Sequence, residues 1–227
     1  MLTLTTLTSM AVVVDTVNMS AAESSRPYHH GQLRESLVQA GLGLARAGGP
    51  DAVVLRAVTR QAGVSHNAAY RHFADRDELL RAVCERCMTE LALLMEQRLA
   101  AVRTRKPVER AWARLSAIGR AYVEFATTET GWFRTAFAVP QTTHLFAAGE
   151  GVGASGLGPY ELLGAGLDEL VAAGAIAAAR RPGAEYAAWS AVHGLSTLLT
   201  AGPLRALSPP ERERALDVVI DGVRRGL

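Results

Sequence analysis

The stretch RPYHHGQLRESLVQAGLGLARAGGPDAVVLRAVTRQAGVSHNAAYRHFADRDELL, residues 26–80, decides the fold of this chain. It reads as three short helices and the start of a fourth, with a Gly-Val-Ser turn at 63–65 between the second and the third. A helix of about eight residues, a glycine, and a short polar helix that ends on an aromatic residue are typical of a helix-turn-helix unit.

Local signals mark the ends of these helices. Apolar residues recur every three or four positions over Gly31–Ala47, which predicts a first helix with one apolar stripe. Gly63 suits the positive φ of a helix C-terminus. Ser65 is placed to cap the third helix, and Asp75 with Glu78 forms an acidic capping pair for the fourth. The unit is held together, we expect, by burial of Phe73 against the first and second helices.

The rest of the chain continues the helical pattern. The fourth helix is expected to run long, over about 76–103, and further helices are expected at 108–127, 130–138, 159–174, 183–201 and 209–225. A Gly-rich segment at 147–159 is expected to be a mobile loop. No stretch shows sustained β alternation. We therefore predict an all-α protein with a disordered tail at 1–25, a helix-turn-helix domain at 26–75 and a C-terminal domain at 76–227.

The charge of the chain is unevenly distributed. The 227 residues carry a formal net charge of only +2, with 49% hydrophobic and 20% charged residues, which suits a globular protein. Between residues 26 and 73, however, six arginines face only two acidic residues, and four of the six histidines lie in the same window. A basic N-terminal quarter on a nearly neutral chain is the electrostatic pattern of a small DNA-binding module.

The sequence contains no pattern that indicates a secretion signal, a membrane span or a metal site. The first twenty residues lack a basic start, and Asp15 interrupts their apolar run. Met10 and Met19 leave a later translation start open. Cys84 and Cys87 lie three residues apart on a predicted helix without a nearby third ligand, which is poor for zinc. We expect buried free thiols, no cofactor and a cytoplasmic location.

The predicted third helix carries side chains that can read DNA. Asn67 can bond bidentately to adenine and Arg71 to guanine. Ser65 offers a hydroxyl and helix N-terminal amides to a phosphate. Tyr70 and His72 suit phosphate oxygens beside the groove.

YHHGQLR, followed by LRAVTRQAGVSHNAAYRHFADRDELL, resembles the N-terminal domain of the tetracycline-repressor (TetR) family of bacterial transcription regulators. The resemblance implies an all-α homodimeric repressor whose C-terminal domain binds a small effector. It also implies a minor-groove arm at Arg26 and a phosphate contact at Arg76, where relatives often carry Lys. The residues that we predict to contact double-stranded operator DNA are Arg26, Arg56, Ser65, His66, Asn67, Tyr70, Arg71, His72 and Arg76.

Two positions depart from the family pattern. Val54 stands just before the second helix, where relatives usually place a Ser or Thr that caps the helix and touches phosphate. Thr59 stands where an Ala commonly packs against the third helix. Both departures could weaken DNA affinity or alter the angle in the groove.

The second half resembles one branch of the same family, through YVEFATTETGWFRTAF (122–137) and the Trp-x-x-x-His-Gly segment within AWSAVHGLSTLLTAG (188–202). Most of its aromatic residues suit helical core packing, while a few could line a cavity for an apolar or amphipathic molecule. His193 fits a satisfied buried histidine better than a ligand contact. The candidate effector-binding residues are Trp112, Tyr122, Phe125, Trp132, Phe133, Phe137, Trp189 and His193.

The last two predicted helices suggest a dimer. The helix around 185–201 is apolar or small nearly all round and therefore needs two partners. The last helix has Leu216, Val219, Ile220 and Val223 on one face. Together the two helices suit a four-helix interface about a two-fold axis.

Three hypotheses about function follow from the sequence. The leading one is a ligand-responsive DNA-binding repressor. An all-α enzyme is disfavoured, because no nucleophile, paired-carboxylate, phosphate-loop or metal spacing emerges. A regulator that binds only proteins through a degenerate DNA domain stays open because of Val54 and Thr59.

Overall fold

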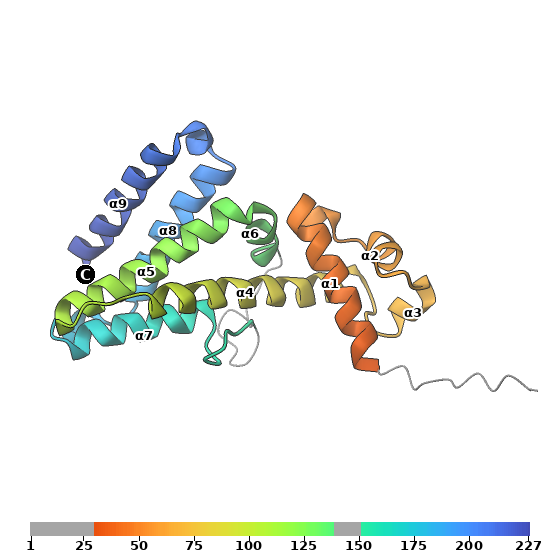
Figure 1. Cartoon of the computed structure of the whole chain (residues 1–227), viewed down its shortest axis with the longest axis horizontal. Helices are drawn as coiled ribbons and strands as arrows, with labels where there is room; N and C mark the ends of the chain where they lie inside the picture. The colour runs from red at the N-terminus through yellow and green to blue at the C-terminus, as the bar shows by residue number, and fades with distance from the viewer. Residues whose placement is uncertain (1–29, 139–150) are drawn as a thin grey trace, which may run out of the picture.

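The computed structural model of the chain describes residues 30–138 and 151–227, and all regular structure in these ranges is helical. The predicted tail at 1–25, Arg26 and residues 147–150 of the Gly-rich segment lie outside the described residues. In Figure 1, α1, α2 and α3 gather at one end, and α4 extends from them alongside the C-terminal helices. The helices are α1 (His30–Gly48), α2 (Leu55–Ala62), α3 (His66–Tyr70), α4 (Arg76–Ala100), α5 (Pro107–Thr128), α6 (Thr130–Ala136), α7 (Pro159–Ala172), α8 (Ala184–Thr200) and α9 (Pro209–Gly226), with short 3-10 turns η1 (Pro50–Ala52), η2 (Ala178–Arg180) and η3 (Pro203–Ala206).

The capping signals predicted around the helix-turn-helix unit are present. Gly63 ends α2 with a φ of 68°. The Ser65 hydroxyl accepts a hydrogen bond from the Ala68 amide at 3.2 Å. At the start of α4, Asp75 Oδ1 accepts from the Glu78 amide at 2.8 Å, and Glu78 Oε2 accepts in turn from the backbone amide of residue 74. These bonds satisfy free backbone amides or carbonyls at the helix ends, which stabilises the short helices of this unit.

A buried core confirms the packing role expected for Phe73. Its side chain is fully buried, as are Leu37 and Val58. The Arg34 guanidinium lies 5.1 Å from the Phe73 ring centre. The three small helices are therefore held by one apolar cluster that continues into α4.

Arg76 has a structural role that the sequence did not reveal. Its Nε donates a hydrogen bond to the Val53 carbonyl at 2.9 Å, and its Nη2 donates to the Pro50 carbonyl at 2.8 Å. Both acceptors lie in the segment that leads into α2. A charge-assisted pair of hydrogen bonds thus ties the first turn of α4 to the beginning of the helix-turn-helix unit.

The short helix α6 makes a second connection between the two halves. Glu129, just before α6, receives two hydrogen bonds from the Arg46 guanidinium of α1, at 2.7 Å and 2.5 Å. Trp132 Nε1 donates to the Leu42 carbonyl at 2.9 Å. Gly131 lies so close to α1 that a Cβ there would meet the Ala45 and Arg46 carbonyl oxygens at 2.3 Å. Only a glycine fits this backbone approach.

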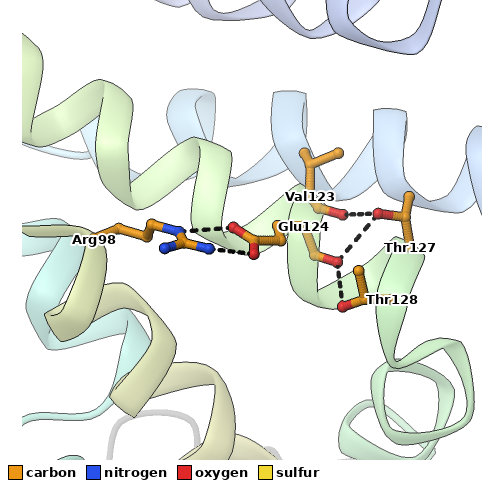
Figure 2. Close-up of polar contacts among 5 residues, drawn as sticks. All are labelled: Arg98, Val123, Glu124, Thr127 and Thr128. Carbon is orange, nitrogen blue, oxygen red and sulfur yellow. Dashed lines mark hydrogen bonds and ion pairs between the residues drawn. The ribbon is translucent and has the colours of Figure 1, made fainter. Parts of the chain in front are cut away.

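At the opposite end of α4, an arginine–carboxylate pair joins α4 to α5 (Figure 2). Arg98 donates to both oxygens of Glu124, with Nε to Oε2 at 2.8 Å. The Thr127 and Thr128 hydroxyls donate back to carbonyls of Val123 and Glu124, at 2.9–3.1 Å. These bonds fix the last turns of α5, immediately before α6 begins.

The described part of the Gly-rich segment is attached to α4. The carboxylate of Glu96 accepts hydrogen bonds from the backbone amides of Ala154 and Ser155, both at 2.9 Å, and from the Ser155 hydroxyl at 2.5 Å. Residues 151–158 therefore have a defined position, whereas the sequence suggested only a mobile loop.

The two cysteines are buried, as expected. Cys84 Sγ donates to the Thr135 carbonyl of α6 at 2.9 Å. Burial raises the pKa of the Cys87 thiol, which keeps it protonated and unreactive. Within the described ranges, the structure contains no helix with the length and apolar character needed to span a bilayer.

The contact between Gly131 and α1 gives a stability prediction. Gly131→Ala places a methyl group against backbone atoms that cannot rotate away, so we expect the free energy of unfolding to fall by about 1–3 kcal/mol. Gly43→Ala, on α1 itself, is the matched control, because its added Cβ meets only the flexible end of Gln61. The control should be neutral or slightly stabilising. Thermal unfolding followed by circular dichroism measures both, and equal melting temperatures would contradict the tight α1–α6 contact.

Candidate functional site

The surface of α3 exposes polar side chains at the end of the molecule. His66, Asn67, Tyr70 and Arg71 are exposed, while Ala69 is fully buried on the opposite side of the helix. The His66 and Tyr70 rings meet edge to face with centres 4.9 Å apart, which orients Tyr70 along the exposed side. The structure therefore brings together the predicted base-reading residues on one accessible surface.

This surface carries positive charge that no carboxylate of the described residues neutralises. Arg56 and Arg60 on α2 and Arg71 beside α3 are exposed, and none forms an ion pair with a carboxylate of the described residues. By contrast, Arg114 and Arg120 in the C-terminal half pair with acidic side chains. Unpaired cations beside a presented helix are what a phosphate backbone requires.

Other predicted contact residues have different surroundings. Ser65 caps α3, and His72 is half-buried just after it. The Arg76 guanidinium is occupied by two backbone carbonyls. Arg26 lies outside the described residues. The contacts of all these residues with DNA remain predictions.

The two departures at α2 have visible structural consequences. Val54 occupies the N-cap position, 39% exposed, and provides no side-chain hydrogen bond to the helix. Thr59 is 5% exposed, and its hydroxyl donates to the Arg56 carbonyl at 3.2 Å. The Thr59 hydroxyl is therefore accommodated where a smaller residue would pack, whereas α2 begins without a side-chain cap.

A second candidate site is an apolar cavity among the C-terminal helices. Its volume, measured as the space open to the centre of a water-sized sphere, is about 90 Å³. Side chains of α4, α5, α7, α8 and α9 form its walls, and residues 151 and 158 lie at its edge. Such a cavity with few polar groups is the usual form of a small-molecule site.

The cavity contains half of the aromatic residues predicted to bind an effector. Trp112, Tyr122, Phe137 and Trp189 line it. The other four predicted residues do not line it: they are Phe125, Trp132, Phe133 and His193. Sequence reasoning could not separate the two groups, because both are aromatic residues of the same helices.

Specific packing explains why these four do not line the cavity. Phe125 is buried and stacks on Trp132, which reaches α1 instead. Phe133 is buried with its ring edge-on to Tyr122 at 5.9 Å. His193 is half-buried beside Phe133, with 5.5 Å between the ring centres. Phe125, Phe133 and His193 support the cavity wall from behind, and Trp132 belongs to the α1–α6 contact.

A small polar network surrounds the hydroxyl of Tyr122, one of the residues that line the cavity. Trp189 Nε1 donates to the Tyr122 hydroxyl at 3.2 Å, and the same hydroxyl lies 2.7 Å from His193 Nδ1. Since Trp189 can only donate, the hydroxyl can donate its own proton to His193 Nδ1. Burial raises the pKa of Tyr122 and lowers that of His193, so both are neutral near pH 7.

Sequence reasoning missed the contribution of α4 to this cavity. Met88, Leu91 and Met95 line it from the helix that also begins at the helix-turn-helix unit. Their spacing of three and four residues was a usable signal for one helix face. The helix α4 thus connects the helix-turn-helix unit, which carries the α3 surface, to the cavity.

The outer surface of α8 and α9 is partly apolar. Tyr186, Leu198 and Val218 are 63%, 42% and 67% exposed. Between the two helices lies a groove of small and apolar residues: Ala187, Ala191, Val219, Gly222, Val223, Gly226 and Leu227.

Part of the apolar stripe predicted for the interface on α9 faces its own domain. Leu216 is buried within the chain itself, and Ile220 and Val223 line the cavity. The stripe is therefore divided: Leu216 and Ile220 pack within the domain, whereas Val219 lines the outer groove and Val223 borders both the groove and the cavity.

Comparison with solved structures shows the same architecture. A protein of unknown function from Rhodococcus sp. RHA1 is 28% identical, with a TM-score of 0.68 over 89% of this chain and 98% of that chain. FadR from Bacillus subtilis, solved with stearoyl-CoA, is 12% identical, with a TM-score of 0.56 over 83% and 98%. RolR, solved with resorcinol, is 14% identical, with a TM-score of 0.56 over 88% and 95%. A comparison with curated proteins found no match.

Two family models match the sequence itself. The model of bacterial regulatory proteins of the tetR family matches residues 37–83, and the tetracyclin repressor-like C-terminal domain model matches residues 115–223. Neither description names the Trp-x-x-x-His-Gly branch, which stays a prediction. Together the two models cover more than two thirds of the chain, one over the helix-turn-helix unit and one over the cavity domain. The chain belongs to the TetR family of DNA-binding transcription regulators.

Proposed function

We propose that this protein is a homodimeric repressor that a small apolar or amphipathic effector releases from its operator. The observation that carries the DNA-binding part is the α3 surface, where exposed polar side chains lie beside arginines that have no acidic partner in the described part of the chain. Asn67 and Arg71 would read bases, and Ser65, Tyr70 and His72 would hold phosphates. Arg56 extends the same positive surface along α2.

The α8–α9 surface supports the dimer. A chain whose exposed residues include Leu198, Tyr186 and Val218 beside a groove of small residues has an apolar surface suited to self-association. Gly194 and Gly222 have open space where a Cβ would stand, so a second helix can approach closely there. A two-fold axis through this surface would pair the same α8–α9 residues of both subunits in one isologous interface.

The effector role rests on α4. Met88, Leu91 and Met95 form one wall of the cavity, and Arg76 fastens the same helix to the segment before α2. A ligand that prefers a different position of α4 would therefore shift the helix-turn-helix units relative to each other. The complexes of FadR with stearoyl-CoA and of RolR with resorcinol show that proteins with this fold can bind small molecules.

The DNA-binding part predicts a specific, salt-dependent complex. The protein should protect a roughly palindromic site near its own gene, with half-sites about 34 Å apart or a small multiple of that distance. Asn67→Ala should weaken operator binding by about 1–3 kcal/mol while leaving binding to scrambled duplex unchanged. Arg110→Ala, an exposed arginine of α5, is the control and should bind like the wild type. Gel shifts at several salt concentrations measure these affinities, and equal affinity of the wild type for operator and scrambled duplex would refute the proposal.

The dimer part predicts a variant that separates the subunits. Leu198→Glu would place a carboxylate in the proposed interface, and burying an unpaired charge there costs several kcal/mol. Leu93→Glu is the matched control, since Leu93 on α4 is 38% exposed against 42% for Leu198. Sedimentation at micromolar concentration should show dimers for the wild type and the control but monomers for Leu198→Glu. A monomeric wild type would rule out this interface.

The coupling through α4 predicts a variant that imitates the effector. Met95→Trp enlarges a side chain that projects from α4 into the cavity, so operator affinity should fall without any ligand, by about 5- to 150-fold. Leu93→Trp adds the same ring to the exposed side of the same helix and should leave the affinity unchanged. Circular dichroism verifies that both variants remain folded. A folded Met95→Trp variant with wild-type operator affinity would show that the cavity and the DNA site are not coupled.

A further inference from the structure

The cavity has a basic side chain at one end. Arg224 near the end of α9 is the only basic residue among the described residues that line the cavity. Its guanidinium carbon lies 5.2 Å from the centre of the Trp112 ring, which belongs to the same lining. Arg224 forms no ion pair with a carboxylate of the described residues. Its charge is therefore available to a ligand.

The neighbouring Arg225 makes different contacts. Its Nη1 lies 2.6 Å from Asp221 Oδ2 one turn earlier, and it does not line the cavity. Both arginines are exposed, but they differ in two respects that matter for ligand binding: Arg224 lines the cavity and has no acidic partner among the described residues, whereas Arg225 does not line it and pairs with Asp221.

The cavity is elongated, and Arg224 and Tyr122 mark different ends of it. Its lining on α5 extends from Trp112 to Tyr122, ten residues that span about 15 Å of helix. Trp112 lies with Arg224, whereas Tyr122 lies with Phe137, 6.3 Å away between ring centres. The walls between these ends carry apolar side chains, among them Met95, Leu115, Ile118, Leu163 and Val192.

Two acidic side chains also line the cavity. Glu161 Oε2 accepts a hydrogen bond from the Gly158 amide at 2.8 Å and caps α7. Glu85 lies on α4 one turn before Met88, beside Gly151. The two carboxylates belong to α4 and α7, whereas Trp112 belongs to α5 and Arg224 to α9. An anion would be repelled by these carboxylates and attracted to Arg224.

We infer that the ligand of this cavity is an elongated amphipathic carboxylate, bound with its acid group at Arg224 and its apolar body directed towards Tyr122 and Phe137. This inference rests on the proposed effector role and names the ligand's chemical class. Arginine presents a planar pair of N–H donors that matches the two oxygens of a carboxylate. The face of Trp112 holds the guanidinium in place from the other side.

Four ten-carbon or closely related probes test this assignment: decanoate, 1-decanol, decylamine and methyl decanoate. We expect decanoate to bind the wild-type protein at least about tenfold more tightly than the neutral probes, because only decanoate forms a charge-assisted pair with Arg224. Isothermal titration calorimetry gives the affinities, and the fluorescence of Trp112 and Trp189 reports entry into the cavity. Equal affinity for decanoate and 1-decanol, or a preference for decylamine, would overturn the inference.

Variants of the two adjacent arginines provide the matched comparison. Arg224→Gln should weaken decanoate binding about tenfold or more and change 1-decanol binding less than about twofold. Arg224→Lys should restore part of the preference, since it keeps the charge but loses the bidentate geometry. Arg225→Gln should bind all probes like the wild type. If Arg224→Gln and Arg225→Gln have equal effects, Arg224 is not the anchor.

A parallel gel shift separates this inference from the proposed function. If decanoate binds through Arg224 and lowers operator affinity, the result supports both the effector role and the carboxylate class of ligand. Decanoate that binds through Arg224 without changing operator affinity leaves the ligand class standing and refutes the effector role. If the wild-type protein binds the operator and 1-decanol releases it as readily as decanoate does, the proposed repressor function stands. The carboxylate anchor at Arg224 is then refuted.

Discussion

The rest of the structure depends on the packing of α4 on more than one side. Buried residues recur around this helix, from Leu79 and Val83 through Met88 and Leu91 to Leu99. It packs against α1 and α6 near one end and against α5 and α7 along its further length. A helix enclosed in this way cannot move without disturbing both the helix-turn-helix unit and the cavity wall. The two hydrogen bonds from Arg76 strengthen this constraint at the DNA end.

Ion pairs are distributed differently in the C-terminal half and on the α2–α3 surface. In the C-terminal half, Arg98, Arg114 and Arg120 are matched by carboxylates on neighbouring helices. On the α2–α3 surface, the arginines have no such partners within residues 30–138 and 151–227. Exposed ion pairs contribute little stability, so their absence at α2 and α3 costs the fold little. The absence of ion pairs leaves positive charge exposed where a polyanion can bind.

Much of the fold was predictable because its signals are local. The cap at Ser65, the positive φ of Gly63 and the acidic pair at Asp75 act within a few residues. The predicted helices of the C-terminal half begin and end within about two residues of the observed ones. The long helix α4 ends at Ala100, whereas we expected its end near residue 103. The sequence carries no strong stop signal in this region, so the end could not be predicted accurately.

The sequence by itself determined the all-α class, the helix-turn-helix unit and the kinds of side chain that α3 presents, since these depend on periodicity, capping and residue chemistry. Only the tertiary structure decided which aromatic residues line the cavity, because Tyr122 and Phe133 differ in the neighbours they meet and not in type. It also decided that Arg76 binds carbonyls while Arg224 faces a cavity. Such roles arise from contacts between segments distant in the sequence, which no local pattern encodes.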